Sequence, residues 1–287
     1  MDRRCCARAA GRFCEPGIAQ SGEVCRDARR RHAAVAMAAV PIETNLREAG
    51  PFRSSAASHA SAARQRNEDS WVNRPDLGLW AVADGAGGHQ AGDVASRIIA
   101  NALEAIPAGL DAAELLAEAR LRLADAHRLM QDEAARHGPD INLVSTIVVL
   151  LARDRHYACL WAGDSRAYLL RRGSLCQVTH DHSLVQQLLD SGAISPAEAD
   201  HHPQRNIITR AVDSAADAVE LDKVTDRLCA GDLFLLCSDG LFKTVAERNL
   251  PALMAESCDA LAERLVVAAL EREADDNVTA VTVEVLD

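Results

Sequence analysis

The chain has 287 residues, 48% of them hydrophobic and 25% charged, with a formal net charge of −11 at pH 7. This composition allows a sizeable globular core without disulfide staples. No apolar run approaches the roughly eighteen residues of a membrane-spanning helix. The acidic balance argues against non-specific nucleic-acid binding and favours a protein that concentrates divalent cations.

The first 50 residues differ from the rest of the chain. Residues 1–40 hold eight arginines against four acidic residues, and no sustained apolar period runs through residues 1–50. We expect this leader to be disordered or poorly packed. It lacks the apolar segment of a targeting peptide, so Met37 is a candidate for the true start of the protein. The folded domain is expected over residues 51–287.

Four of the nine cysteines fall in the leader, at no recognisable zinc spacing, and the other five lie in mostly apolar surroundings. We interpret these five as reduced core cysteines of a cytosolic protein, which predicts a cytoplasmic location. They are Cys159, Cys176, Cys229, Cys237 and Cys258.

The folded domain is predicted to begin with extended chain and to continue into a pair of long helices. Residues 64–72 read as an extended segment and residues 73–78 as a turn. A strand follows over 79–83 and runs into glycines. Apolar residues at helical spacing then predict two antiparallel helices, over 91–106 and 112–136.

Strands dominate the second half of the domain. The first four of these strands are separated by short connections, none long enough for a helical crossover. They could therefore form an antiparallel meander. A polar insertion, residues 180–212, is predicted to form short helices. Strands are predicted over 145–152, 156–163, 167–171, 174–178, 219–224, 232–237 and 278–286, and helices over 250–254 and 259–273. This grouping of strands and helices predicts the α+β class, with antiparallel sheets covered by helices.

Acidic residues recur where predicted strands end. Asp84 follows the apolar run that begins at Leu79 and precedes Gly85, Gly87 and Gly88. An acid–glycine pair alone usually marks only a turn. Here the pattern recurs in four further clusters: Asn67-Glu68-Asp69, Gly163-Asp164-Ser165-Arg166, Ser238-Asp239-Gly240 and Asp275-Asp276-Asn277.

Carboxylates at strand ends can converge at one end of a sheet sandwich. Asp84, Asp239 and Asp276 each adjoin an apolar strand, and converging carboxylates repel one another unless a cation neutralises them. Oxygen ligands without nearby histidine or cysteine select magnesium or manganese over zinc. Two such ions, roughly 3.5–4 Å apart, would activate a water and clamp a phosphoryl group. Arg64 is the natural arginine to bind the outer phosphate oxygens.

Six motifs occur in the order of a known family. They are Arg64-Gln65-Arg66-Asn67-Glu68-Asp69-Ser70, Asp84-Gly85-Ala86-Gly87-Gly88-His89, Ser145-Thr146, Gly163-Asp164-Ser165-Arg166, Ser238-Asp239-Gly240-Leu241 and Asp276-Asn277-Val278-Thr279. With these motifs the chain resembles the metal-dependent serine/threonine phosphatases of type 2C over roughly residues 60–285, and segments 181–185 and 202–210 are typical of the bacterial branch. One such motif would be weak support, whereas six in the family order are specific.

The resemblance implies a fold, a metal centre and a set of site residues. The fold is a central sandwich of two antiparallel β-sheets flanked by antiparallel helix pairs, with a flap over about 180–212 beside the active site. The cofactors are two core Mn²⁺ or Mg²⁺ ions and a weaker third ion. By resemblance, Arg64 binds the substrate phosphate. Asp84 bridges both core metals, Gly85 offers its carbonyl to one of them, and Asp239 and Asp276 bind the other. Glu68 and Asp69 act through coordinated water, and Asp164 joins Asp239 at the third ion.

The implied activity is hydrolysis of phosphoserine and phosphothreonine in proteins by metal-activated water, with Arg64 and Asp84 as catalytic residues. Animal members carry a histidine two residues after the bridging aspartate, proposed as the general acid, and Ala86 takes that position here. The general acid is therefore unassigned, and a metal-bound water could serve. We interpret His89 as structural.

Two alternatives stay open. One is a catalytically weak fold that binds phosphoproteins as a regulator. The other is a phosphatase of anti-sigma-factor antagonists, although the leader is too short for the sensory domain usual in those enzymes. The expected partners are phosphorylated proteins, namely a bacterial Ser/Thr kinase and its targets, with a link to type VI secretion by analogy with phosphatases beside such clusters. A monomer is expected, with no nucleic acid bound and no membrane span.

Overall fold

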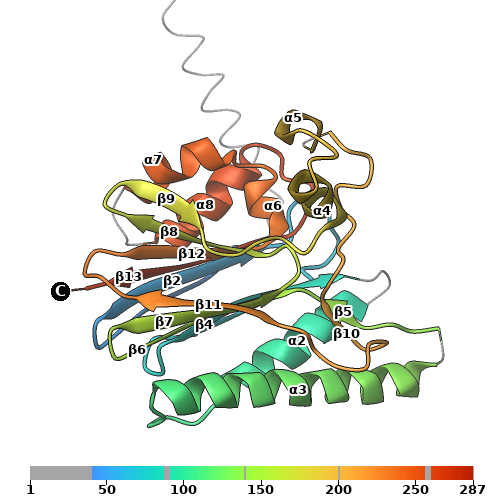
Figure 1. Ribbon diagram of the computed structural model, residues 1–287, viewed down its shortest axis with the longest axis horizontal. Coiled ribbons are helices and arrows are strands. Elements are labelled where there is room, and N and C mark those ends of the chain that lie inside the picture. Colours follow the sequence, from blue (N-terminus) through green and yellow to red (C-terminus); the bar gives the residue numbers. More distant parts are fainter. Residues whose placement is uncertain (1–40, 87–90, 139, 200, 256–259, 287) are drawn as a thin grey trace, which may run out of the picture. The chain divides into compact units, whose positions relative to one another are not determined.

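The computed structural model describes residues 41–286, apart from 87–90, 139, 200 and 256–259. Within these residues two antiparallel β-sheets lie face to face, and helices cover both outer faces (Figure 1). The predicted α+β sandwich is confirmed. Among the described helices, none combines the length and the apolar character needed to cross a bilayer.

Each sheet gathers strands from distant parts of the chain. In the first sheet the order is β1-β2-β13-β12-β8-β9, and in the second it is β10-β5-β4-β6-β7-β11, with β3 paired to β4. The first sheet contains β1 (Glu43–Ala49), β2 (Phe52–His59), β8 (Arg166–Arg171), β9 (Ser174–Gln177), β12 (Leu233–Cys237) and β13 (Val278–Val285). The second contains β3 (Asp69–Arg74), β4 (Leu79–Ala86), β5 (Val144–Ser145), β6 (Ile147–Arg153), β7 (His156–Ala162), β10 (Val212–Asp213) and β11 (Asp222–Arg227).

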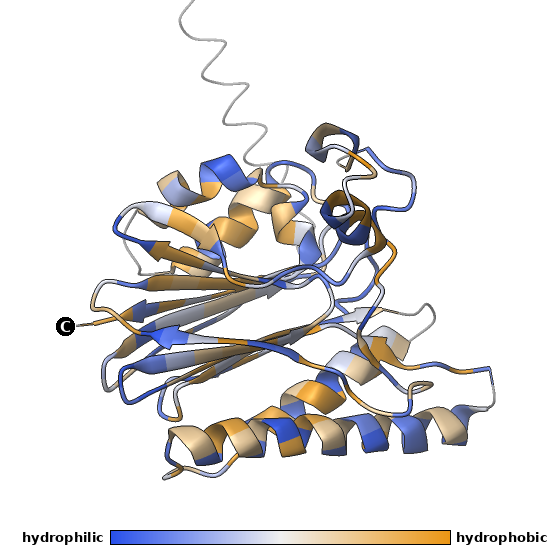
Figure 2. Cartoon of the chain, in the orientation of Figure 1, coloured by the Kyte–Doolittle hydropathy of each residue, from blue (hydrophilic) through white to orange (hydrophobic). Residues whose placement is uncertain are grey.

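The helices form the two outer layers and the flap. The predicted long pair, α2 (Ala91–Glu104) and α3 (Ala112–His137), packs on the second sheet. α3 begins with a capping box, in which Asp111 and Glu114 each accept the other's backbone N–H. Figure 2 shows hydrophobic and hydrophilic patches alternating along α3, as one buried face requires. The first sheet is covered by α6 (Asp239–Phe242), the 3₁₀ turn η1 (Glu247–Asn249), α7 (Leu250–Met254) and α8 (Leu261–Leu270), while α4 (Leu184–Asp190) and α5 (Pro196–Ala199) lie in the flap.

Aromatic and aliphatic side chains together fill the space between the sheets. Phe52 meets Trp80 edge-on with ring centroids 5.1 Å apart, and Tyr157 meets Phe234 at 5.0 Å. Since helices cover the outer faces, central strands such as β6 are buried on both sides. This explains why they read as continuous apolar runs rather than as alternating patterns.

The predicted boundary at residue 51 was wrong. β1 lies within the expected leader and pairs with β2 along its whole length, from Glu43 opposite Ser58 to Ala49 opposite Phe52. β1 is an exposed edge strand with polar residues on both faces, so it carries no apolar period that sequence reasoning could detect. Residues 1–40, including Met37, lie outside the described residues.

The permitted meander is divided between the two sheets. β6 and β7 form a hairpin in the second sheet, whereas β8 and β9 form one in the first. The chain crosses from one sheet to the other at Gly163, whose φ of +116° favours glycine. This crossing places Asp164 at the end of the sandwich where the other acidic clusters lie. β11 begins three residues later than its predicted start at 219.

Candidate active site

Strand ends from both sheets bring the predicted acidic residues together. Pairing of β3 with β4 sets Asp69 directly opposite Asp84. On the side of the first sheet, a Cβ on Gly240 would lie 2.1 Å from the carbonyl oxygen of Asn277. Glycine at 240 therefore lets α6 approach the start of β13, and with it Asp239 approaches Asp276, whose pKa is raised by burial and then by the Asp239 charge.

The carboxylates of this cluster repel one another. Burial raises the pKa of Asp84 well above its usual range, and the charges of Asp69, Asp239, Asp164 and Asp276 raise it further, in that order. Burial also raises the pKa of Asp69 to about 7 and that of Asp164 to about 7, with Asp239 adding to both. Carboxylates from five chain segments therefore share one site, and their negative charge exceeds the positive charge beside them.

Asp69 is held by two hydroxyl groups. Ser238 Oγ and Thr279 Oγ1 donate to its Oδ2 at 2.7 and 2.6 Å. Its Oδ1 is buried and has no hydrogen-bond partner. The same is true of Asp164 Oδ1. Buried acceptors are almost always satisfied, so these two oxygens point to a missing positively charged partner.

Glu68 and the Gly85 carbonyl line a small cradle. The Gly85 oxygen lies 2.8 Å, and Glu68 Oε2 2.9 Å, from the point that a Cβ on Gly92 would occupy. Two oxygens thus face one point that only glycine leaves open. Burial raises the pKa of Glu68, and the nearby charge of Asp93, which was not predicted, adds to that rise.

Two cationic side chains pair with predicted metal ligands. Arg64 Nη2 donates to Asp276 Oδ2 at 2.6 Å, and Lys243 Nζ donates to Asp239 Oδ2. Burial opposes the charge of Lys243, but the carboxylates outweigh it, Asp239 most of all, and the pKa of Lys243 is raised. Sequence reasoning missed Lys243, although its position four residues after an acid at a helix start is the spacing of an ion pair.

Asn277 is a second residue that was missed. Its amide donates to the carbonyls of Ala60 and Arg66, at 3.0 and 2.9 Å, and its Oδ1 accepts the backbone N–H of Glu68 at 2.9 Å. One buried side chain thus fixes the loop that carries both Arg64 and Glu68. A polar residue directly after Asp276 at a strand start was the available signal.

The residues present fit a hard divalent cation. Among the described residues, no group of three or more Asp, Glu, His or Cys side chains is arranged to coordinate a metal ion by itself. The candidate donors are nevertheless all oxygens, and they include the Gly85 carbonyl and two unpartnered buried carboxylate oxygens. Such a donor set suits Mg²⁺ or Mn²⁺.

The flap is anchored beside this cluster. Arg166 of β8 forms a forked pair with Asp181, at 2.7 Å for the shortest contact, and its guanidinium lies 3.8 Å from the Phe242 ring centre. Trp161 Nε1 also donates to the His180 carbonyl at 2.8 Å. Between the flap and α6 lies a cavity of about 820 Å³, lined among others by Arg64, Asp164, Asp276, Lys243, Ser183, Val185 and Leu189.

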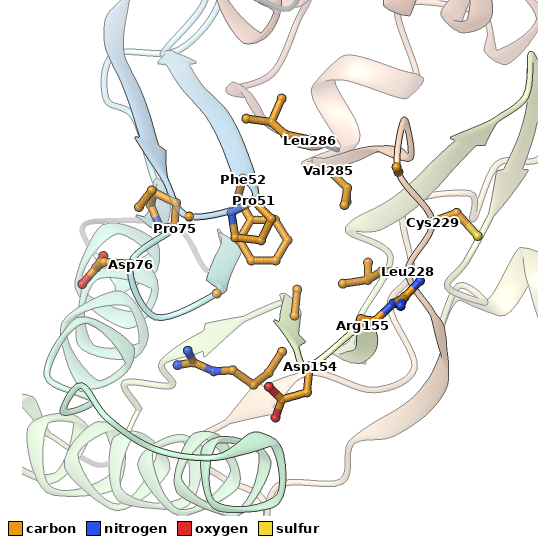
Figure 3. Close-up of a pocket in the computed structure, with 16 residues that line it drawn as sticks. Pro51, Phe52, Pro75, Asp76, Asp154, Arg155, Leu228, Cys229, Val285 and Leu286 are labelled. Atoms are coloured by element: carbon orange, nitrogen blue, oxygen red, sulfur yellow. The ribbon is translucent and has the colours of Figure 1, made fainter.

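A second cavity, of about 520 Å³, lies at the opposite ends of the strands (Figure 3). Phe52, Arg155, Leu228 and Val285 are among its lining residues, and none of the predicted site residues is. Its position beside the hairpin turns separates it from the acidic cluster. Gly87, Gly88 and His89 of the glycine-rich motif lie outside the described residues.

Comparisons with known proteins identify the family of this chain. The model of the family "Protein phosphatase 2C" matches residues 57–273. Serine/threonine protein phosphatase PstP of Mycobacterium tuberculosis is 38% identical over 240 residues, covering 82% of this chain and 45% of PstP. The chain thus spans about half the length of this curated relative.

Two solved structures resemble the fold closely. That of "PppA, a key regulatory component of T6SS in Pseudomonas aeruginosa" has a TM-score of 0.75 and 40% identity, covering 84% of this chain and 99% of that one. The catalytic domain of PstP "in complex with 2 Manganese ions" has a TM-score of 0.70 and 35% identity, covering 82% and 99%.

Proposed function

The chain belongs to the protein phosphatase 2C family, and from this membership we propose that it hydrolyses phosphoserine and phosphothreonine in proteins. The observation that carries the proposal is the gathering of Asp84, Asp69, Asp239, Asp164 and Asp276 beside Arg64, where burial and the neighbouring carboxylates raise the pKa of Asp84 well above its usual range. A cluster so rich in negative charge is suited to divalent cations and through them to a phosphate.

The residues that would hold two core ions are Asp84, the Gly85 carbonyl, Asp239 and Asp276, with Glu68 and Asp69 in support. Mn²⁺ or Mg²⁺ bound there supplies an activated water near neutral pH and withdraws charge from the phosphoryl oxygens. Support for manganese comes from the PstP catalytic domain, whose structure is described as holding two manganese ions.

Arg64 would orient the phosphate. Its pair with Asp276 is half exposed, with side-chain exposures of 48% and 32%. If a cation were bound by Asp276, the planar guanidinium of Arg64 would be free to bind two phosphate oxygens at once. Flap residues Ser183, Val185 and Leu189 would contact the peptide on either side of the phosphorylated residue.

The pathway is proposed from similarity. We infer a role opposite a bacterial Ser/Thr kinase because PstP and the stp proteins of Listeria are named serine/threonine phosphatases, and the description of PppA supports a link to T6SS. A cytoplasmic location is proposed because Cys159, Cys176, Cys229 and Cys237 are free thiols, as a reducing compartment would keep them.

The proposal is tested by hydrolysis of a phosphothreonine peptide and of p-nitrophenyl phosphate in Mn²⁺. Asp84→Asn and Asp239→Asn should each lower kcat at least ~100-fold while circular dichroism stays unchanged, because each removes a metal ligand. Retained activity in both variants would refute the assignment.

A further inference from the structure

Lys243 is one of two lysines in the sequence, the other being Lys223. It follows Asp239 by four residues, and its Nζ donates to Asp239 Oδ2. A second bond, to Asn206 Oδ1 at 2.9 Å, ties it to the flap. The ammonium group is therefore fixed from two sides.

Asp164 faces the same cavity as this ammonium group, since both residues line it. Asp164 is 4% exposed, and its Oδ1 has no hydrogen-bond partner. Burial raises the pKa of Asp164, and the smaller effect of the Lys243 charge lowers it. Lys243 therefore binds one of the two carboxylates that the type 2C resemblance assigns to a weak third metal ion, and lies in the same cavity as the other.

We propose that the Lys243 ammonium group replaces this third ion, so that the chain holds two divalent cations and a built-in monovalent one. The inference rests on the proposed phosphatase function, which supplies the two core ions. It is an alternative to the expectation that Asp164 and Asp239 share a third metal. A dication at that position would have to displace Nζ from Asp239 Oδ2 and remain next to a like charge.

Arg64 shows why Lys243 is different. Arg64 also pairs with a predicted ligand, but its side chain is 48% exposed, so it can move away when a metal binds. The Lys243 side chain is 29% exposed, against 15% for its partner Asp239, and Asn206 holds it from the flap side. Asp239 Oδ1 is left for a core ion while Oδ2 stays with Lys243.

The experiment counts bound metal. Free Mn²⁺ is measured by electron paramagnetic resonance as the full chain is titrated into the millimolar range, which gives the number of ions bound without measuring activity. Wild type should bind two. Lys243→Ala should gain a third, weaker ion, because Asp164 and Asp239 lose their counter-charge, and adding Asp164→Ala should remove it again.

Two controls test whether the charge is responsible. Lys243→Arg keeps the charge and should stay at two ions, as should Lys223→Ala, which removes the exposed lysine of β11. If Lys243→Ala does not fold, Lys243→Gln removes the charge and keeps most of the length. A folded neutral variant that still binds two ions overturns the inference.

Wild type with three ions, the third lost in Asp164→Ala, would also overturn it while leaving the phosphatase proposal intact. A folded wild type that binds no Mn²⁺ would instead remove the proposed function, and the role of Lys243 with it.

Discussion

At the scale of single residues, Arg64 and Asp276 form an ion pair with which a cation bound at Asp276 would compete. In the described structure each satisfies the other at 2.6 Å. The sequence could predict that both belong to the site, because each lies in a motif. It could not predict that they pair, because the two residues are more than two hundred positions apart and the pairing depends on the fold.

Arg64→Ala should raise KM for a phosphopeptide roughly 10- to 100-fold, since a hydrogen bond to a charged group contributes about 1.5–3 kcal/mol. The number of bound Mn²⁺ ions should not change. Arg66→Ala is the matched control, because Arg66 is an exposed neighbour in the same loop. An unchanged KM for Arg64→Ala would count against its role.

Asp84→Asn should stabilise the metal-free protein while abolishing its response to manganese. At pH 8 in EDTA, the variant replaces a carboxyl group whose pKa is raised by burial and by four neighbouring carboxylates with a neutral amide. Its free energy of unfolding should then exceed that of wild type by about 1 kcal/mol or more. Urea unfolding with and without Mn²⁺ measures both effects, and a variant less stable than wild type in EDTA would contradict this account.

At the scale of elements, periodic segments were predicted well, whereas β1 and β2 were not predicted as strands. α3 buries one apolar face, so its position followed from the spacing of its apolar residues. β1 and β2 were missed because one is a polar edge strand and the other is rich in Ser and Ala. Asn277 and Lys243 were missed because their roles depend on contacts between elements.

Asp181→Ala should loosen the flap. Asp181 and Arg166 are 7% and 20% exposed at their side chains and form a forked pair, so losing one partner should cost roughly 3–5 kcal/mol. KM for peptide substrates should rise, because the cavity wall moves. Asp190→Ala removes an exposed pair of α4 with His180 and should leave thermal unfolding almost unchanged. Equal losses in the two variants would show that the flap is not anchored by Asp181.

At the scale of the whole molecule, the acidic cluster makes the metal-free protein sensitive to pH. The folded-state pKa of Asp69 and of Asp164 is raised to about 7, so the folded chain binds more protons than the unfolded chain between about pH 4 and pH 7. The stability that Asp69 and Asp164 contribute in their protonated form should be fully present below this window and should be lost as pH rises through it.

In EDTA, the free energy of unfolding should therefore fall from pH 5 to pH 7, and Asp69→Asn should fall less steeply than wild type. Burial lowers the pKa of His182, which acts in the opposite direction, so the difference between the two proteins isolates Asp69. Urea titrations at four pH values measure it. Parallel curves for wild type and Asp69→Asn would contradict the charge cluster.

The central claim is that carboxylates from distant strand ends surround divalent cations. Anomalous diffraction from crystals soaked in Mn²⁺ tests it most directly. The account predicts two manganese peaks within coordination distance of Asp84, Asp239 and Asp276, with Lys243 still bound to Asp239. Crystals with no manganese between Asp84 and Asp276 would contradict it.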